Sequence, residues 1–153
     1  MLNVVLVEPE IPPNTGNIGR LCLASGSRLH LVKPLGFDLD AKQVRRAGLD
    51  YWDQVDLRLW DSFSQLRASI DRTGDTPRLF LATTKGATPH WDARFSDGDF
   101  LVFGRETKGL PESLLARHPE DCIRIPMQPE ARSLNLATAV GIVLFEALRQ
   151  IHA

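Results

Sequence analysis

Residues 2–32 read LNVVLVEPEIPPNTGNIGRLCLASGSRLHLV, and this stretch decides the fold class. It opens with Leu2–Val7, an apolar run without alternation, which is typical of a strand covered on both faces of a sheet. A helix is expected from Asn14, acting as its N-cap, to Ala24, and Gly26 is a suitable C-terminal stop. A second short apolar strand follows at Leu29–Val32. Strand, helix and strand within about 30 residues predict a βαβ unit.

The remainder of the chain continues this alternation. We expect helices near residues 41–47, 62–70, 111–117 and 136–152, and strands near residues 55–59, 79–82, 100–103 and 122–125. The last helix carries an apolar stripe of Leu136, Val140, Val143, Ala147 and Ile151. The predicted fold is therefore α/β, a mostly parallel sheet with helices on both faces, and ligands are expected at the carboxyl ends of its strands.

Composition limits the class of protein. The 153 residues are 43% hydrophobic and 24% charged, which fits one soluble domain of residues 1–153. No run approaches the ~18 apolar residues of a membrane-spanning helix, and the N-terminus lacks the features of a secretion signal, so we expect a cytoplasmic protein without a membrane partner. Cys22 and Cys122 have no partner at metal-binding spacing and are expected to be buried thiols.

The formal net charge of −1 does not announce a nucleic-acid partner, but the charge is unevenly distributed. Between residues 28 and 46, two acidic residues stand among five basic ones, Arg28, Lys33, Lys42, Arg45 and Arg46. This stretch is either a footprint for a polyanion or an exposed helix face of mixed charge.

Three loops follow predicted strands and have unusual composition. Residues 8–20 combine prolines with Asn14 and Gly16 at a helix N-terminus, where free amides favour an anionic group. Residues 102–111 place two glycines and Glu106 after a buried strand, and residues 125–135 contain polar side chains before the last helix. Each loop taken alone fits an ordinary turn or helix cap as well as a ligand site.

Several familiar catalytic patterns are missing from the sequence. There is no phosphate loop, no dinucleotide fingerprint after the first strand and no Gly-x-Ser-x-Gly elbow. The four histidines, His30, His90, His118 and His152, are scattered and are expected to be structural or exposed. Asp92, Asp97 and Asp99 do not form a cation-binding loop, so no metal site is expected.

Taken together and in this order, the three loops resemble the three motifs of the SpoU branch of the SPOUT RNA methyltransferases. The matching patterns are Asn14-x-Gly-x-x-x-Arg20, Phe103-Gly-x-Glu-x-x-Gly-Leu-Pro111 and Ile125-Pro-Met-x-Pro-x-x-Arg-Ser-Leu-Asn-Leu136. The opening segment, residues 45–51 and residues 83–86 are most similar to the minimal members that methylate the ribose of tRNA nucleotide 34 and have no added RNA-binding domain.

The resemblance implies a deep C-terminal trefoil knot, a homodimer and a pocket for S-adenosylmethionine as methyl donor, with no metal. The exposed side of the last helix is where we expect the dimer contact. By motif position, the residues expected to bind the methyl donor are Ala82, Thr83, Gly104, Ile125, Met127 and Ser133.

The implied reaction is 2′-O-methylation of the wobble nucleotide, C34 or a modified U34, in the tRNA anticodon stem-loop. Its expected catalytic residues are Arg20, which would act on the ribose hydroxyl from across the dimer, Glu106, which would orient Arg20 or the ligand, and Ser133 and Asn135. A guanidinium is almost never neutral, so stabilising the developing alkoxide suits Arg20 better than acting as a base. Asn14, Arg45 and Arg46 are expected to contact the RNA.

One position departs from the common motif. Arg105 stands where related sequences commonly have proline, which would loosen the loop or add a phosphate contact. Three alternatives stay open at this stage: a catalytically silent tRNA-binding knot protein, a 2′-O-methyltransferase acting on another RNA site, and a nucleotide-binding α/β enzyme of another type.

Overall fold

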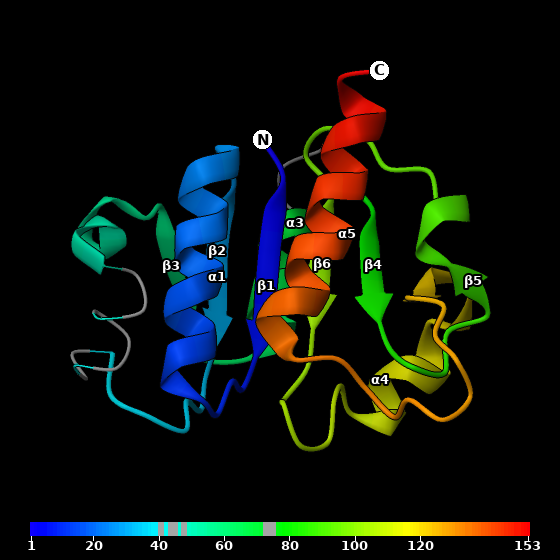
Figure 1. Ribbon diagram of the computed structural model, residues 1–153, viewed down its shortest axis with the longest axis horizontal. Coiled ribbons are helices and arrows are strands. Elements are labelled where there is room, and N and C mark those ends of the chain that lie inside the picture. The colour runs from blue at the N-terminus through cyan, green and yellow to red at the C-terminus, as the bar shows by residue number, and fades with distance from the viewer. Residues whose placement is uncertain (40–41, 43–45, 47–48, 72–75) are drawn as a thin grey trace.

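The computed structural model describes residues 1–39, 42, 46, 49–71 and 76–153. Its centre is a seven-stranded sheet of order β3-β2-β1-β6-β4-β7-β5 (Figure 1). All six pairs of neighbouring strands are parallel, which confirms the predicted sheet. The strands are β1 (Asn3–Val7), β2 (Arg28–Val32), β3 (Leu57–Trp60), β4 (Leu79–Ala82), β5 (Thr88–Pro89), β6 (Phe100–Phe103) and β7 (Cys122–Arg124).

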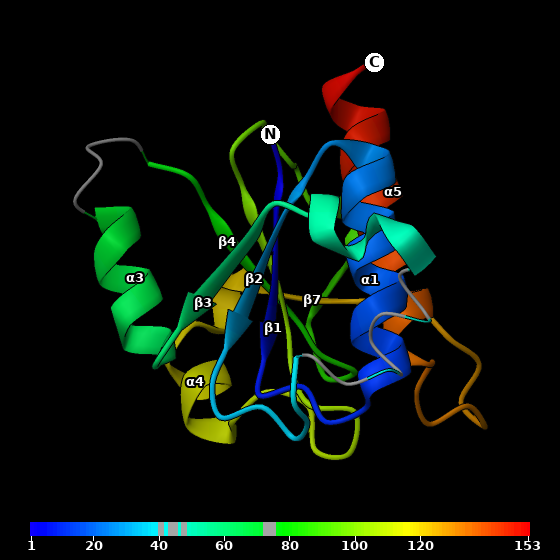
Figure 2. The same cartoon turned by 90° about the vertical axis from the view of Figure 1, so that its left-hand side faces the viewer.

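The helices cover the sheet on both sides. Figure 2 shows α1 and α5 on one face and α3 and α4 on the other. The helices are α1 (Pro12–Ser25), α3 (Phe63–Asp71), α4 (Glu112–Arg117) and α5 (Leu136–Ile151), with 3-10 turns η1 (Leu49–Gln54), η2 (His90–Asp92) and η3 (Pro119–Asp121). The helix predicted for residues 41–47 falls mainly on residues outside the described ones.

Strand β1 shows why the sequence has no alternation. Val4 and Leu6 pack into the apolar cluster beneath α1 and α5, whereas Val5 and Val7 pack into the cluster beneath α3. Both faces of a parallel sheet are covered, so every side chain of this strand has to be apolar or hydrogen-bonded. Asn3 is the one polar residue of β1, and its side chain contacts His30.

The start of α1 differs from the prediction. Asn14 does not cap the helix: Ile11 occupies the N-cap position, without a side-chain hydrogen bond, and prolines stand at the first two helical positions. Proline is well suited there because its missing N–H has no partner in a helix. The side chain of Asn14 is buried instead and accepts a hydrogen bond from Asn135. Gly26 ends the helix in the left-handed conformation, as predicted.

The other boundaries agree with the prediction to within one residue, apart from β3, which begins at Leu57 rather than at Val55. The residue before it is Asp56. Its carboxylate lies just before β3 and accepts hydrogen bonds from the side chains of Arg28 (3.0 Å) and Arg58 (2.6 Å). The two-residue strand β5 was not predicted, because so short a segment has no periodicity.

Helix α5 buries the predicted stripe and leaves apolar residues on its other side. Val140, Val143 and Ala147 are fully buried. On the outer face, Ile142 and Phe145 remain 36% and 48% exposed, which keeps this face a reasonable place for the predicted dimer contact. In the described part of the chain, no helix is both long enough and apolar enough to cross a membrane.

His30 and both cysteines are structural, as predicted. Cys22 and Cys122 are buried free thiols. His30 lies buried in β2, where its Nδ1 accepts a hydrogen bond from Trp60 (3.0 Å) and its Nε2 lies 2.9 Å from the amide oxygen of Asn3. These two contacts select the neutral tautomer that carries its proton on Nε2. Burial, aided by the nearby charges of Arg28 and Arg58, lowers the pKa of His30 to about 4.

Candidate active site

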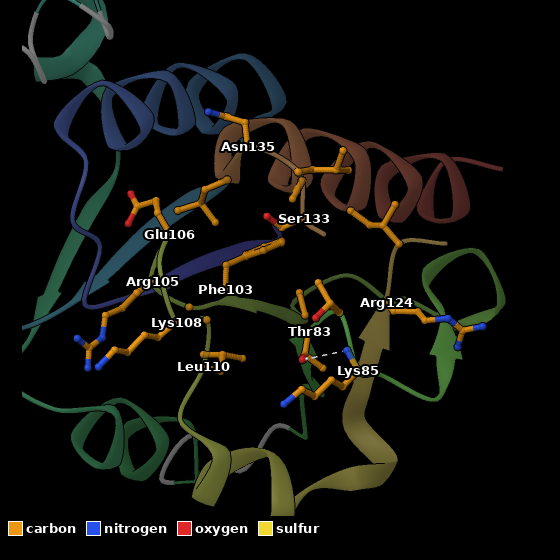
Figure 3. A pocket seen from close by; sticks show the side chains of 18 of the residues that line it. Thr83, Lys85, Phe103, Arg105, Glu106, Lys108, Leu110, Arg124, Ser133 and Asn135 are labelled. Atoms are coloured by element: carbon orange, nitrogen blue, oxygen red, sulfur yellow. Dashed lines mark hydrogen bonds between the residues drawn. The ribbon is translucent and has the colours of Figure 1, made fainter. Parts of the chain in front are cut away.

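One cavity of about 660 Å³ lies at the carboxyl ends of β4, β6 and β7 (Figure 3). This volume is within the usual range for small-molecule sites, ~300–1,000 Å³. Its walls come from residues 82–85, 103–110 and 123–136, with Ile11 and Asn14 adding the start of α1. The three loops that the sequence singled out therefore meet at one place, the edge where ligands of open α/β sheets bind.

The loop after β6 is packed too closely for any side chain at Gly104. A Cβ atom there would lie 2.1 Å from the backbone of both Gly109 and Leu110. Arg105 and Gly109 exchange two backbone hydrogen bonds, of 3.2 and 2.9 Å, and Gly109 has a positive φ of 67°. The motif glycines thus close residues 104–109 into a compact turn, which we call the motif-two turn.

Two carboxylates join the motif-two turn to the loop that precedes α1. Glu106 accepts hydrogen bonds from the backbone N–H groups of Glu10 (2.8 Å) and Ile11 (3.0 Å). In return, Glu10 accepts from the hydroxyl of Thr107 (2.7 Å) and from its N–H (3.2 Å). We call these four bonds the carboxylate clasp. Within one subunit the Glu106 carboxylate holds the start of α1, and its predicted role of orienting Arg20 or the ligand stays a prediction.

The electrostatics of the carboxylate clasp favour the ionised form of Glu10. The hydrogen bonds from Thr107 hold the pKa of Glu10 below its usual value, and the charges of Arg105 and Lys108 act more weakly in the same direction. Hydrogen bonds between a carboxylate and backbone amides are stronger than neutral ones. The clasp is therefore intact at neutral pH.

Asn135 has two structural roles at the cavity. Its oxygen caps α5 by accepting from the N–H of Thr138 (3.2 Å), and its amide nitrogen donates to Asn14 (3.0 Å). The capping alternative considered for this residue is thus correct, and the bond to Asn14 links the first and third motifs across 121 residues. Asn135 still lines the cavity, so a ligand contact is compatible with its cap.

The segment of residues 126–135 is much more open than the motif-two turn. Within it, one backbone bond closes a turn, from Ala131 N–H to the Gln128 carbonyl (3.0 Å). Ser133 is exposed and, like Phe103, lines the cavity (Figure 3). Leu134 is 38% exposed although it is apolar.

The predicted site residues separate into two groups. Twelve positions were named, and the structure brings nine of them to the cavity: Asn14, Ala82, Thr83, Gly104, Glu106, Ile125, Met127, Ser133 and Asn135. Arg20 does not line this cavity and is exposed on α1, and Arg46 is exposed as well. Arg45 lies outside the described residues.

The basic stretch of residues 28–46 has fewer unpaired charges to offer a polyanion than its sequence indicates. Arg28 pairs with Asp56 at 3.0 Å and Lys33 with Asp61 at 3.8 Å, and both carboxylates come from outside the stretch.

Sequence reasoning missed other residues of the cavity, among them Lys85, Phe103, Lys108 and Leu110. Their position inside the same loops was the signal that could have identified them.

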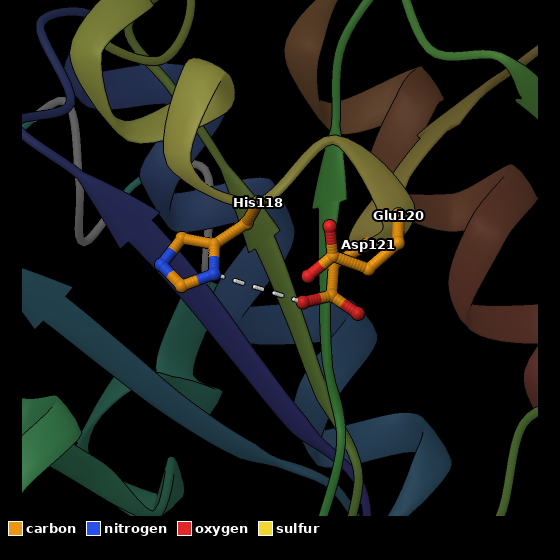
Figure 4. Close-up of side chains that lie close together, drawn as sticks. All are labelled: His118, Glu120 and Asp121. Atoms are coloured by element: carbon orange, nitrogen blue, oxygen red, sulfur yellow. Dashed lines mark ion pairs between the residues drawn. The ribbon is translucent and has the colours of Figure 1, made fainter.

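A separate cluster of potential metal ligands lies outside this cavity (Figure 4). Among the described residues, His118, Glu120 and Asp121 bring three ligand atoms within 4.8 Å of one another. Asp121 is already engaged, because it lies 3.4 Å from Arg78 and 3.9 Å from His118. The cluster fits a local ion-pair network, and the prediction of no metal stays a prediction.

A parallel α/β sheet with a cavity at its carboxyl edge, lined by three motif loops, is the arrangement of a small-molecule site in an open α/β fold. Residues 1–145 match the model of the SpoU rRNA Methylase family. The chain belongs to this family, which confirms the resemblance drawn from the motifs. The trefoil knot stays a prediction.

Individual relatives match nearly the whole chain. The tRNA (cytidine(34)-2′-O)-methyltransferase of Burkholderia cenocepacia is 51% identical, over 98% of this chain and 96% of the relative. A structure described as giving insights into the 2-OH methylation of C/U34 on tRNA has 49% identity and a TM-score of 0.92, covering 98% and 95% of the two chains. The AdoMet complex of the SpoU methyltransferase AviRb from Streptomyces viridochromogenes has 27% identity and a TM-score of 0.87, covering 98% and 57%.

Proposed function

We propose that this protein transfers the methyl group of S-adenosylmethionine to the ribose 2′-hydroxyl of the wobble nucleotide 34, a cytidine or modified uridine, in tRNA. The observation that carries the proposal is the convergence of all three motif loops on one cavity. The domain of residues 1–153 would bind the anticodon stem-loop with its own surface, and the reaction would take place in the cytoplasm.

The choice of nucleotide rests on the relatives. The family name refers to rRNA, whereas the relatives at about half identity and nearly full length are named for cytidine 34 of tRNA. Nucleotides of single-stranded loops can be splayed out and bound individually, and an anticodon wobble nucleotide is of this kind. The resemblance of the opening segment, residues 45–51 and residues 83–86 pointed to the same nucleotide.

The cavity suits the methyl donor in chemistry as well as in size. Apolar walls from Phe103, Leu110 and Ile125 fit a flat adenine base, while Thr83 and Ser133 offer hydroxyl groups for polar edges. When bound, S-adenosylmethionine supplies a methyl group on a sulfonium, and the sulfur leaves as a neutral thioether. This chemistry requires no metal.

The protein's own contribution is placement. The motif-two turn and the carboxylate clasp fix the wall of the cavity, and Ser133 and Asn135, which also line it, would hydrogen-bond the donor or the ribose. Holding the attacking oxygen about 3–3.5 Å from the methyl carbon can supply several kcal/mol of rate acceleration.

Arg20 has to come from a second subunit for its predicted role, since it does not line its own subunit's cavity. We propose a homodimer in which Arg20 of one subunit reaches the cavity of the other. Its charged guanidinium would bind a phosphate of the RNA and stabilise the developing alkoxide, and the proton would pass to that phosphate or to water. The exposed Ile142 and Phe145 of α5 are the apolar surface proposed for the dimer contact.

The direct test is transfer of labelled methyl groups into tRNA that lacks its native modifications, followed by mapping of the methylated nucleotide. We expect a 2′-O-methyl group at position 34 and its loss in the folded Arg20→Ala variant. Donor binding and tRNA binding without transfer would favour the silent RNA-binding alternative. Absence of donor binding would refute the methyltransferase proposal.

Subunit mixing tests whether Arg20 acts across the dimer. Arg20→Ala retains an intact cavity, and Gly104→Ala retains Arg20. If Arg20 serves the other subunit's cavity, mixed dimers regain one complete site, and a random mixture recovers about one quarter of the wild-type activity. If Arg20 acts within its own subunit, the mixed dimer has no complete site and the mixture stays inactive.

A further inference from the structure

The motif-two turn carries two cations, one on each side of the clasped residues. Arg105 and Lys108 flank Glu106 and Thr107, whose side chains are bound to the loop before α1. Because the turn is also closed by the Arg105–Gly109 backbone bonds, the Cα positions of both cations are fixed relative to the cavity. Figure 3 shows their side chains leaving the turn in the same direction, away from Ser133.

Neither cation has an ion-pair partner among the residues that the structure describes. This separates them from the two other basic residues labelled at the cavity in Figure 3. Lys85 pairs with Glu112 at 2.8 Å, and Arg124 donates to the carbonyls of Gly86 (3.0 Å) and Ala87 (2.6 Å). Lys108 is exposed and Arg105 is half-buried, so both charged groups are accessible to a ligand.

The neighbouring carboxylates leave this surface available to an anion. Both oxygens of Glu106 accept from backbone amides, and one oxygen of Glu10 accepts both bonds from Thr107. Arg105 and Lys108 lie near enough to Glu10 to lower the pKa of its carboxyl group, but neither forms an ion pair with it. Two accessible cations on one turn beside a cavity have the charge and the hydrogen-bond donors that phosphate groups require.

We propose that Arg105 and Lys108 form a phosphate clamp that holds the RNA backbone next to the nucleotide being methylated. The inference rests on the proposed function, because it places the clamp on the same RNA. The clamp belongs to the subunit that holds the methyl donor, whereas Arg20 comes from the other one. Its role is positioning: it fixes the backbone while the ribose enters the cavity, and it does not contact the reacting atoms.

The clamp predicts a specific pattern of charge dependence. Phosphate contacts release counterions, so the slope of log Kd against log salt changes by ~0.7 for each contact with a single strand. Removing both charges in Arg105→Gln/Lys108→Gln should therefore reduce the slope by about 1.4 and raise the Kd for RNA about tenfold or more at moderate salt. The swapped variant Arg105→Lys/Lys108→Arg keeps both charges and should stay within about threefold of the wild type.

The experiment measures the Kd of the wild-type protein and the variants for an anticodon stem-loop RNA carrying C34, at several salt concentrations. A matched control removes two exposed charges away from the cavity, in Arg94→Gln/Arg117→Gln. The control should bind as the wild type does. Binding of S-adenosylmethionine, measured by calorimetry in every variant, reports separately on the cavity that Arg105 and Lys108 also line. The neutral variant should raise KM for RNA more than it lowers either donor affinity or kcat.

A second measurement locates the contact. Stem-loops with an uncharged methylphosphonate linkage on either side of nucleotide 34 remove one phosphate charge at a time. The wild-type protein should lose affinity for at least one of them, while the neutral variant, which already lacks the clamp, should lose little more. Additive losses, unchanged salt slopes, or equal losses in the neutral and the swapped variants would overturn the clamp.

These outcomes separate the clamp from the proposed function. If the wild-type protein binds the stem-loop but does not methylate position 34, the proposed function fails, and the binding data still decide whether the clamp exists. If the wild-type protein methylates position 34 while the neutral variant binds normally, the clamp is refuted and the function stands. A protein that binds no RNA would overturn both.

Discussion

The motif-two turn follows β6 and the segment of residues 126–135 follows β7. Both line the same cavity, yet they are built differently. The turn is closed by backbone bonds, by the close packing of Gly104 and by the carboxylate clasp. The segment from Pro126 to Asn135 is exposed over most of its length and is tied mainly at its end, where Asn135 contacts Asn14.

This difference shows how the two walls of the site serve binding. The shape of the turn is determined by the protein alone, so it can receive a ligand without rearrangement. The open segment has few internal contacts, and elements of this kind open with little free-energy cost. We therefore expect the ligand to complete the second wall but not the first.

The largest effect is expected from a side chain that prevents the turn from closing. Gly104→Ala places a Cβ atom 2.1 Å from two backbone atoms, which cannot move without opening the turn. We expect the free energy of unfolding to fall by more than about 2 kcal/mol and donor affinity to fall at least about tenfold. Urea denaturation and calorimetry measure the two effects.

Gly141→Ala serves as the control for this substitution. Gly141 lies in α5, and an added Cβ would meet Leu21 at an ordinary 3.6 Å. The higher helix propensity of alanine should leave stability unchanged or raise it by up to ~1 kcal/mol. If Gly104→Ala were as stable as Gly141→Ala, the turn would not be closed in the way described.

Acid should destabilise the sheet through protonation of His30, which is the next largest effect. The pKa of His30 is about 4 in the folded protein and 6.5, its ordinary value, in the unfolded chain, so between these values the unfolded chain binds more protons. Its contribution is fully present above pH 6.5 and is lost as pH falls toward 4. The loss reaches about 3 kcal/mol at pH 4, since each pKa unit corresponds to about 1.4 kcal/mol.

Denaturation at several pH values tests this expectation with His30→Gln, which removes the titrating group. The variant should lack the change between pH 6.5 and 4. Glu10 behaves differently because its pKa is lowered: its contribution is present above its unfolded value of 4.5 and is lost only below that. A slope between pH 6.5 and 4 that survives in the variant would assign the effect to another group.

A smaller effect is expected from weakening the clasp without disturbing the backbone. Glu106→Gln replaces two charge-assisted bonds to the amides of Glu10 and Ile11 by at most one neutral bond. We expect a loss of about 1–2 kcal/mol in stability and a several-fold loss in donor affinity. Glu112→Gln is the matched control. Both side chains of the Glu112–Lys85 ion pair are exposed, so the pair should contribute less than ~1 kcal/mol to stability.

Much of the fold could be predicted because each strand and helix carries its own local signal. The apolar runs gave β4 and β6 with their observed boundaries, and the stripe of α5 gave its buried face. The start of α1 could not be predicted correctly, because the partner that removes Asn14 from a capping role is Asn135, which lies far away in sequence. The motif spacing likewise gave the lining residues of the cavity.

The partners of charged groups were the least predictable part of the site. Nothing local to Glu106 shows that its oxygens accept from Glu10 and Ile11, and nothing in the basic stretch shows that Arg28 pairs with Asp56. Such contacts depend on the order of strands in the sheet. Arg20 shows the same limit at a higher level, since its predicted role depends on a second subunit.

The smallest effect on stability, and the most direct test of the comparison, concerns Ser133. Its side chain is exposed and forms no hydrogen bond within the described residues, so Ser133→Ala should change the free energy of unfolding by less than ~0.5 kcal/mol. Donor affinity should still fall about three- to tenfold, as for the loss of one hydrogen bond to a ligand.

Hydrogen exchange then distinguishes the two walls of the cavity. On donor binding, amides of residues 127–135 should gain protection, whereas the Gly109 amide, already bonded to Arg105, should gain little. Equal gains in the turn and the segment would mean that the turn is also completed by the ligand, and the contrast between a preformed and a ligand-completed wall would have to be abandoned.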